Sequence, residues 1–294
     1  MPPNGNIPDS GTVNVGGNAS CTASTAGTTI VLDTQAVDGT IAVNTQGAAG
    51  HATIVNATAL TLAASSVGGN LTATATLGNL TDGGTITVGG NASFTTSENN
   101  ANILANQLAV TGRLAANTTG PTGNATLVNT KDVELAASRV GGNLTVTAST
   151  GGISDSGTVA VGGNASYTNT IAGNTITLKQ PDVDGSFTLS ALGSGANVTT
   201  GNANGVALAT SGIGGNLDVT ATDGNITDTG TITVGGTARY IASAADRTIT
   251  LDTQVVTGAF TVRTNGTNGD VAITHNTGAE LSASSIGVGT NMHA

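Results

Sequence analysis

The sequence has few charged and aromatic side chains and almost no cysteine. Charged residues make up 8% of the chain and aromatic residues 2%, and Trp is absent. Typical domains hold about 25% charged residues, so this is not the composition of an ordinary globular domain. The single cysteine, Cys21, cannot form an intramolecular disulfide. A lone cysteine fits a secreted bacterial protein that does not rely on disulfides.

The scarcity of basic residues excludes whole classes of partner. The chain has 7 Lys and Arg and a net charge of −10. These basic residues are scattered and form no stripe, so we expect no nucleic-acid partner. No apolar run approaches about 18 residues, so we expect no membrane span. Residues 1–5 have neither the basic nor the apolar region of a signal peptide. An export signal would therefore lie outside this chain.

The sequence does have 44 glycines and a great deal of Thr, Ala, Asn, Ser and Val. Hydrophobic residues make up 37% of the chain and recur in patterns, which argues against disorder. Glycine does not recur at every third residue, so a collagen helix is excluded.

A long internal repeat with a constant interval runs through the chain. The segment Gly-Asn-Ile-Pro-Asp-Ser-Gly-Thr begins at Gly5 and recurs in related form from Gly78, Gly151 and Gly224, which are evenly spaced. Fixed periods of this kind indicate stacked repeats. We therefore expect a single β-solenoid over residues 1–294, built from modules 5–77, 78–150, 151–223 and 224–294.

A shorter pattern within each module sets the predicted coil. A β-branched residue, then any residue, Gly and usually a polar residue begins at Val15, Val37 and Val67, and Val88 starts the next module. We interpret each step as one coil of three short strands, which predicts about twelve coils. In the segment 144–148, Leu-Thr-Val-Thr-Ala, apolar residues alternate with Thr, as in a strand. The predicted fold is an all-β, right-handed parallel β-helix.

Two sets of residues are predicted to hold the coils together. Positions that stay apolar in every module should form inward core columns. The Asn residues that follow the Gly pairs should form a hydrogen-bonded ladder at the turns. The core columns are Ile30, Ile103, Ile176, Ile249 and Leu62, Leu135, Leu208, Leu281, with further columns at Cys21, Phe94, Tyr167, Tyr240 and Ile41, Leu114, Phe187, Phe260; the turn ladder is Asn18, Asn70, Asn91, Asn143, Asn164 and Asn216.

The runs 140–148 and 224–236 carry a family resemblance. Val-Gly-Gly-Asn-Leu-Thr-Val-Thr-Ala and Gly-Asn-Ile-Thr-Asp-Thr-Gly-Thr-Ile-Thr-Val-Gly-Gly are similar to the repeats of filamentous-haemagglutinin-type exoproteins, which are two-partner-secreted bacterial adhesins. The resemblance covers the whole chain and rests on low-complexity patterns. It implies a right-handed parallel β-helix, export to the cell surface, and a role as adhesin shaft or extracellular fibre. The family's secretion domain is not visible here, which suggests a segment of a longer protein.

No residue pattern predicts catalysis, a cofactor or a metal site, so we expect no enzyme. The histidines have no Ser or Cys partner in a recognisable motif, and His275 stands where other modules have Asn56, Asn129 and Asn202, as a polar turn residue. The Asp column at Asp9, Asp82, Asp155 and Asp228 repeats every three predicted coils, about 14 Å apart. Paired carboxylates in glycosidases are about 5–10 Å apart. These Asp residues are therefore expected to cap turns.

The composition and the repeat favour a structural function. We expect an extracellular or cell-surface shaft or fibre whose ends associate with further copies or with more of a longer chain. The alternative is a module that binds a host glycan or protein on one face, although few aromatic side chains are present for sugar stacking. Ice binding is disfavoured because the outward Thr pairs, such as Thr72 and Thr74, have unlike residues at equivalent slots. A polysaccharide-degrading enzyme is disfavoured because no carboxylate cluster is present.

Overall fold

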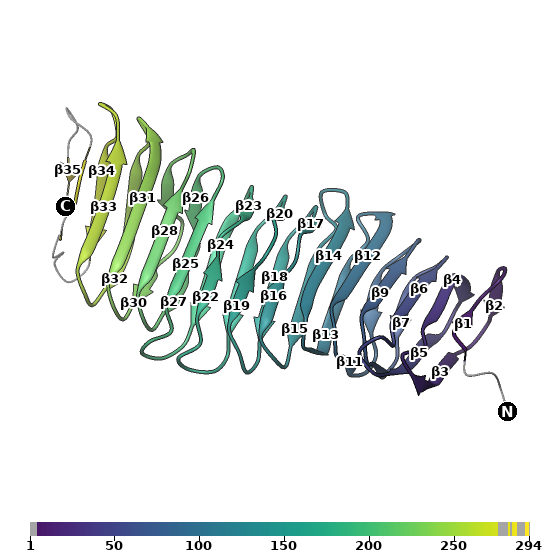
Figure 1. The fold of residues 1–294 in the computed structure, drawn as a ribbon. Helices are drawn as coiled ribbons and strands as arrows, with labels where there is room; N and C mark the ends of the chain where they lie inside the picture. The colour runs from purple at the N-terminus through teal and green to yellow at the C-terminus, as the bar shows by residue number, and fades with distance from the viewer. Residues whose placement is uncertain (1–4, 276–281, 283, 287–291, 294) are drawn as a thin grey trace. The chain divides into compact units, whose positions relative to one another are not determined.

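A computed structural model describes residues 5–275, 282, 284–286 and 292–293. Residues 1–146 and 147–294 form two compact units. Each unit is a parallel β-solenoid in which successive coils stack on one another (Figure 1). The described part of the chain contains strands and no helix, so no helix in it could cross a membrane. The predicted all-β solenoid is confirmed.

Each coil has two main faces, so every unit consists of two facing parallel sheets rather than the three-stranded coils that we predicted. Some strands are interrupted and appear as two short strands in the same sheet. In unit 1, sheet 1A contains β1 (Ile7–Pro8), β2 (Val13–Val15), β4 (Ile30–Val37), β6 (Ala52–Asn56), β9 (Leu71–Ala75), β12 (Ala92–Asn99), β14 (Arg113–Thr119), β16 (Val133–Leu135) and β17 (Ser138–Val140). Sheet 1B contains β3 (Ala19–Ala26), β5 (Thr40–Gln46), β7 (Leu60–Leu62), β8 (Ser65–Val67), β10 (Leu80–Asp82), β11 (Ile86–Val88), β13 (Ile103–Val110) and β15 (Ala125–Asn129).

The second unit has the same construction, and β18 (Leu144–Ala148) contains the division between the units. Sheet 2A contains β19 (Ile153–Asp155), β20 (Val159–Val161), β22 (Ile176–Leu178), β23 (Pro181–Val183), β25 (Val198–Asn202), β28 (Leu217–Ala221), β31 (Ala238–Ala245) and β33 (Phe260–Asn265). Sheet 2B contains β21 (Ala165–Asn169), β24 (Ser186–Ala191), β26 (Val206–Leu208), β27 (Ser211–Ile213), β29 (Ile226–Asp228), β30 (Ile232–Val234), β32 (Ile249–Val256), β34 (Val271–His275) and β35 (Met292–His293).

The strands form because apolar and small polar residues alternate with period two. In β9 the side chains of Leu71, Ala73 and Ala75 are fully buried, while Thr72 and Thr74 face outward. Stacking repeats this pattern in register, so that Ala73 lies between Ile54 and Phe94 of the neighbouring coils. Burying one Ile or Phe side chain contributes about 1.5–3 kcal/mol. The dry interior between the two sheets is therefore the main source of stability.

Each module contains three and a half coils, which corrects the predicted three. Val15 pairs with Val37 within sheet 1A, and Val67 pairs with Val88 within sheet 1B. These two shorter steps of the pattern are therefore single coils. Val37 and Val67 lie on opposite sheets, so the longer step between them covers one and a half coils. The two units together hold about 13 turns.

The half coil moves equivalent residues of consecutive modules to opposite sheets. Ile30 and Ile103 are both buried but belong to sheets 1A and 1B, and Ile176 and Ile249 belong to sheets 2A and 2B. The predicted Ile and Leu positions therefore lie inside the solenoid without forming one column each. The other predicted core residues are also buried, apart from the half-buried Cys21: Leu62, Leu135, Leu208, Ile41, Leu114, Phe94, Tyr167, Tyr240, Phe187 and Phe260. Leu281 lies outside the described residues.

Candidate functional site

Each Asp of the predicted Asp column caps a bulge in a strand of the next coil, whereas we predicted that it caps its own turn. The long strand of each module is interrupted near residues 33–34, 106–107, 179–180 and 252–253. The carboxylate of Asp155 accepts the backbone N–H groups of Lys179 and Gln180, both at 2.8 Å. Asp228 accepts those of Asp252 and Thr253 in the same way. Each Asp thereby satisfies the backbone groups that the bulge removes from the sheet.

Asp9 shows the same capping at the first bulge. One carboxylate oxygen accepts the backbone N–H and the hydroxyl of Thr34, both at 3.0 Å, and the side-chain amide of Gln35. Desolvation of the carboxyl works against ionisation, but these hydrogen bonds outweigh it and lower the pKa of Asp9 to about 2. Asp82 accepts the N–H of Gln107 at 2.7 Å. Asp9 and Asp82 lie in sheets 1A and 1B, respectively, or directly beside them, so the column forms no carboxylate cluster.

Buried Asn side chains form clamps that the sequence analysis missed. Asn56 is fully buried at the end of β6, where its amide accepts the N–H of Val37 at 2.9 Å and donates to the carbonyl of Val37 at 3.0 Å. Asn129 and Asn202 make the same pair of bonds to Val110 and Val183. The side-chain amide thus replaces a backbone peptide where the shorter strand stops. The period-two positions 52, 54 and 56 were the signal for an inward Asn.

His275 takes the place of this clamp in the fourth module, half-buried at the end of β34 and not at a turn as predicted. Its Nε2 accepts the N–H of Val256 at 2.9 Å, and the ring meets the edge of Phe260 at a centroid distance of 5.2 Å. Nε2 also lies 3.1 Å from the Val256 carbonyl. One ring nitrogen cannot donate and accept at once, so the histidine satisfies one of the two backbone groups at a time.

The exposed Asn residues at the turns form a ladder, but not by stacking side chain on side chain. In five of the six predicted residues, Oδ1 accepts the backbone N–H of the residue one coil further on, as between Asn70 and Asn91 at 2.9 Å. Asn18, Asn91, Asn164 and Asn216 bond the N–H groups of Thr40, Arg113, Ser186 and Thr237. Asn143 belongs to a ladder whose lower members we did not predict: Asn79, Asn102 and Asn124.

Ser side chains bridge the strands that are interrupted. The hydroxyl of Ser65 accepts the N–H of Val43 at 3.0 Å and donates to the carbonyl of Ala63 at 2.8 Å. Ser138 and Ser211 make equivalent pairs of bonds. All three are buried. The short gap between the two half-strands therefore leaves these backbone groups satisfied.

Two buried tyrosines occupy equivalent positions with different surroundings. The hydroxyl of Tyr240 donates to Oε1 of Gln254 at 2.7 Å, and Gln254 in turn donates to Asp228 at 2.8 Å. The hydroxyl of Tyr167 has no hydrogen-bond partner among the described residues, because Pro181 stands where Gln254 does. Burial raises the pKa of both phenols, and Asp155 and Asp228 add to this effect.

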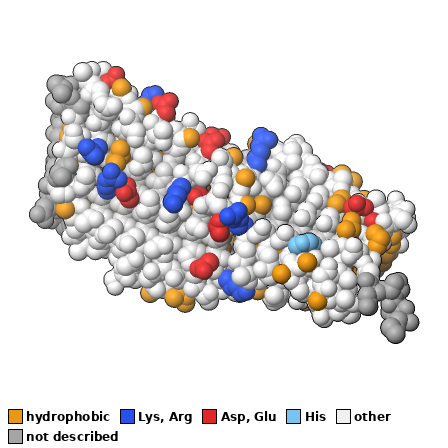
Figure 2. All heavy atoms as spheres, viewed as in Figure 1, with side chains coloured by type: hydrophobic (Ala, Val, Ile, Leu, Met, Phe, Trp, Pro, Cys, Tyr) orange, Lys and Arg blue, Asp and Glu red, His pale blue; other side chains and the backbone are white. Residues whose placement is uncertain are grey.

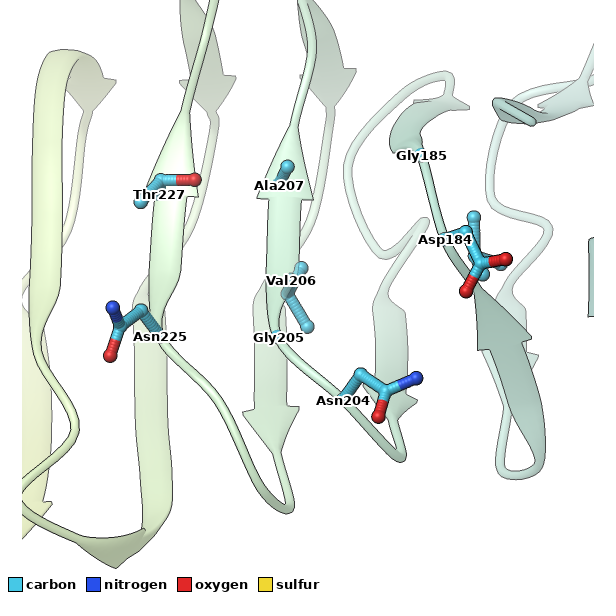
Figure 3. A pocket seen from close by; sticks show the side chains of 9 residues that line it. Asp184, Gly185, Asn204, Gly205, Val206, Ala207, Asn225 and Thr227 are labelled. Carbon is cyan, nitrogen blue, oxygen red and sulfur yellow. The ribbon is translucent and has the colours of Figure 1, made fainter. Parts of the chain in front are cut away.

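A shallow hollow of about 330 Å³ lies at one turn of unit 2 (Figure 3). Asp184, Asn204, Asn225 and Thr227 supply its polar groups, and Gly185 and Gly205 bring backbone close to it. The module-2 residues equivalent to Asn204, Gly205 and Ala207 are larger: Lys131, Asp132 and Glu134. The hollow thus exists where module 3 has smaller side chains, and its groups can exchange hydrogen bonds with a hydroxylated ligand.

Charged side chains are sparse on the surface. Figure 2 shows basic and acidic side chains scattered among neutral ones on one face. Within the described part of the chain, ion pairs join neighbouring coils at Arg113–Glu134, Arg239–Asp218 and Arg247–Asp223, with distances of 2.7–2.9 Å. Among the described residues, no cluster of three or more His, Cys, Asp or Glu could hold a metal ion. The register between coils also corrects the predicted neighbours of the outward Thr pair: in the adjacent coils, Thr72 lies beside Thr53 and Ser93 and not beside unlike residues.

These features define the chain as a repeat β-solenoid structural protein, in which polar side chains satisfy the backbone of adjacent coils. The chain belongs to the family described as Repeats of unknown function (DUF5649), whose model matches residues 49–117, 122–190 and 195–263. The starts of the matches have the same constant interval as the starts of the modules. No curated protein and no solved structure matches the chain.

Proposed function

We propose that the chain is a structural shaft segment of an extracellular bacterial adhesin or fibre of the filamentous-haemagglutinin type. The observation that carries this proposal is the use of its polar side chains. The Asp, Asn and Ser columns bind backbone groups of neighbouring coils. Side chains engaged in this way stiffen the stack and are not free for catalysis, so the proposed protein is not an enzyme.

End-to-end contact is the proposed mode of extension. In the first coil of unit 1, Val13 is 41% exposed, whereas its equivalent Ile86 is fully buried. Cys21 is half-buried, whereas the equivalent Phe94 is fully buried. A further coil, from a second copy or from more of a longer chain, would cover these side chains. Solenoid ends also offer unpaired strand edges for such contact.

Electron microscopy and localisation of the native protein test the structural proposal. We expect antibodies against the chain to label cell-surface fibres or spikes on intact cells, and stiff rods to appear in negative stain. Labelling confined to the interior of permeabilised cells would contradict the extracellular assignment. Turnover of any polysaccharide in a substrate screen would contradict the structural role.

The hollow in unit 2 favours a second candidate function, which is glycan binding on one side of the shaft. Asp184 offers a carboxylate that accepts from sugar hydroxyls, and Asn204 and Asn225 offer amides. A hollow of this size lies at the lower end for ligand sites, which run to about 300–1,000 Å³. Glycan-array binding by the wild type, and its loss in Asp184→Ala, would support this function. Equal binding by Asp184→Ala would exclude the hollow.

A further inference from the structure

The outward side chains of sheet 2B between β21 and β30 form a surface without charge, here called the neutral face. It consists of Ser166, Thr168, Ser186, Thr188, Ser190, Ala207, Gly212, Thr227 and Thr233. The opposite sheet of the same unit carries four outward charges, at Asp182, Asp218, Arg239 and Arg263. Two exposed carboxylates border the neutral face: Asp252, in the bulge of β32 of the same sheet, and Asp184, which lines the hollow together with Ala207 and Thr227. The two sides of unit 2 therefore differ sharply in charge.

Equivalent residues of consecutive modules show that the difference in charge depends on the sheet that carries a residue and not on the position of that residue within the module. Ser166 and Ser190 on the neutral face are the equivalents, one module earlier, of Arg239 and Arg263 on sheet 2A. Asp182 on sheet 2A has the equivalent Val255 on sheet 2B. At these three module positions, the residue on sheet 2A is charged and the residue on sheet 2B is neutral.

Apart from the hollow beside Asp184, the neutral face is suited to close approach by a flat surface. Its side chains are small and stand in register from coil to coil, as in the row Thr168, Ser190, Gly212 and Thr233. Two sheets with small side chains pack about 10 Å apart. With about 4.8 Å between coils and about 3.3 Å per residue, the face covers roughly 500–600 Å².

We propose that the neutral face is a lateral self-association surface, on which two copies of the chain pair sheet against sheet. Each copy carries a net charge of −10, so like chains repel one another unless they meet where charge is absent. A two-fold pairing would bury roughly 1,000–1,200 Å² in total, at the lower end for specific interfaces. The pair is therefore weak and concentration-dependent. Combined with end-to-end contact, it would turn single shafts into bundles.

Sedimentation velocity over a range of concentrations tests the proposal with a matched pair of variants. Thr188 on the neutral face and Thr261 on sheet 2A are the same residue at the same module position on opposite sides. We expect the wild type to form dimers, Thr188→Lys to raise the dimer Kd by about tenfold or more, and Thr261→Lys to leave it unchanged. Added salt should strengthen the wild-type pair by screening the net charge.

Three results would overturn the proposal. They are a wild type that stays monomeric at every concentration, equal loss of dimer in Thr188→Lys and Thr261→Lys, and a double variant Thr188→Lys/Thr227→Lys that dimerises as strongly as the wild type. Thermal melts by circular dichroism establish that each variant is folded. End-to-end association is distinguishable, because it gives species larger than dimers and does not respond to Thr188→Lys. The proposed structural function therefore does not depend on this result.

Discussion

At the residue scale, the two buried tyrosines give opposite expectations for the same substitution. Tyr167→Phe removes a buried hydroxyl without a described partner, so we expect stability to stay equal or rise by up to about 1 kcal/mol. Tyr240→Phe leaves Oε1 of Gln254 without its donor and should cost about 1–2 kcal/mol. Urea unfolding of the two variants measures both. The equivalent Phe94 shows that the fold accepts phenylalanine here; equal destabilisation by the two substitutions would contradict this account.

The buried clamp predicts a large effect for one Asn and a small effect for another. Asn129→Ala leaves both backbone groups of Val110 without partners inside the solenoid, which should cost about 2–4 kcal/mol. Asn70→Ala is the control, because its acceptor is exposed and water can replace it, so we expect about 1 kcal/mol or less. Thermal unfolding measures the difference.

His275→Asn should stabilise the chain by about 1 kcal/mol, since an amide satisfies both groups of Val256.

The low pKa of Asp9 predicts acid sensitivity with a definite sign. The folded-state pKa of about 2 lies below the ordinary value of 3.8, so ionised Asp9 stabilises the folded state. This contribution is complete above the ordinary value and is lost as the pH falls toward about 2. Asp9→Asn removes it. We expect the difference in melting temperature between wild type and Asp9→Asn to shrink over this acid range; a constant difference would contradict the assignment.

At the element scale, the tight turns depend on glycine where a neighbouring coil comes close. A Cβ on Gly112 would lie 2.5 Å from the Oδ1 of Asn91 and from the carbonyl oxygen of Gly90. Gly112→Ala should therefore cost about 1–3 kcal/mol through overpacking and a broken ladder bond. Gly16 is the control, because a Cβ there meets nothing within 4 Å. Chemical denaturation of both variants checks this, and equal stability would show that the turn can move aside.

The sequence predicted strands, inward residues and stacked coils correctly because alternation is a local property. Ala52, Ile54 and Asn56 share one inward phase, but polarity alone led us to place the Asn slot at a turn. The half coil was harder to foresee, because residues 37 and 67 look alike in sequence and lie on opposite sheets. The longer spacing between these two residues than between the other copies of the pattern was the available signal. The side chains that accept hydrogen bonds from the next coil could not be predicted, because that requires the register between neighbouring coils.

At the scale of the whole molecule, stability should depend little on salt. The three ion pairs of the described residues join side chains that are 38–66% exposed, and such pairs contribute about 0–1 kcal/mol each. Apolar burial and neutral hydrogen bonds carry the fold instead. We expect the melting temperature to change by no more than about 2–4 °C between low salt and about 0.5 M NaCl. A large fall would show that charge pairs matter more than this structure indicates.

The fractional coil count of the module has a consequence for how such proteins evolve. Duplicating or losing one module keeps every inward residue inward, so the fold tolerates the event. The same event moves the outward residues of every later module to the opposite sheet, because each module contains three and a half coils. A surface that must stay on one side survives only gains and losses in pairs. Selection on such a surface would therefore favour an even count of repeats.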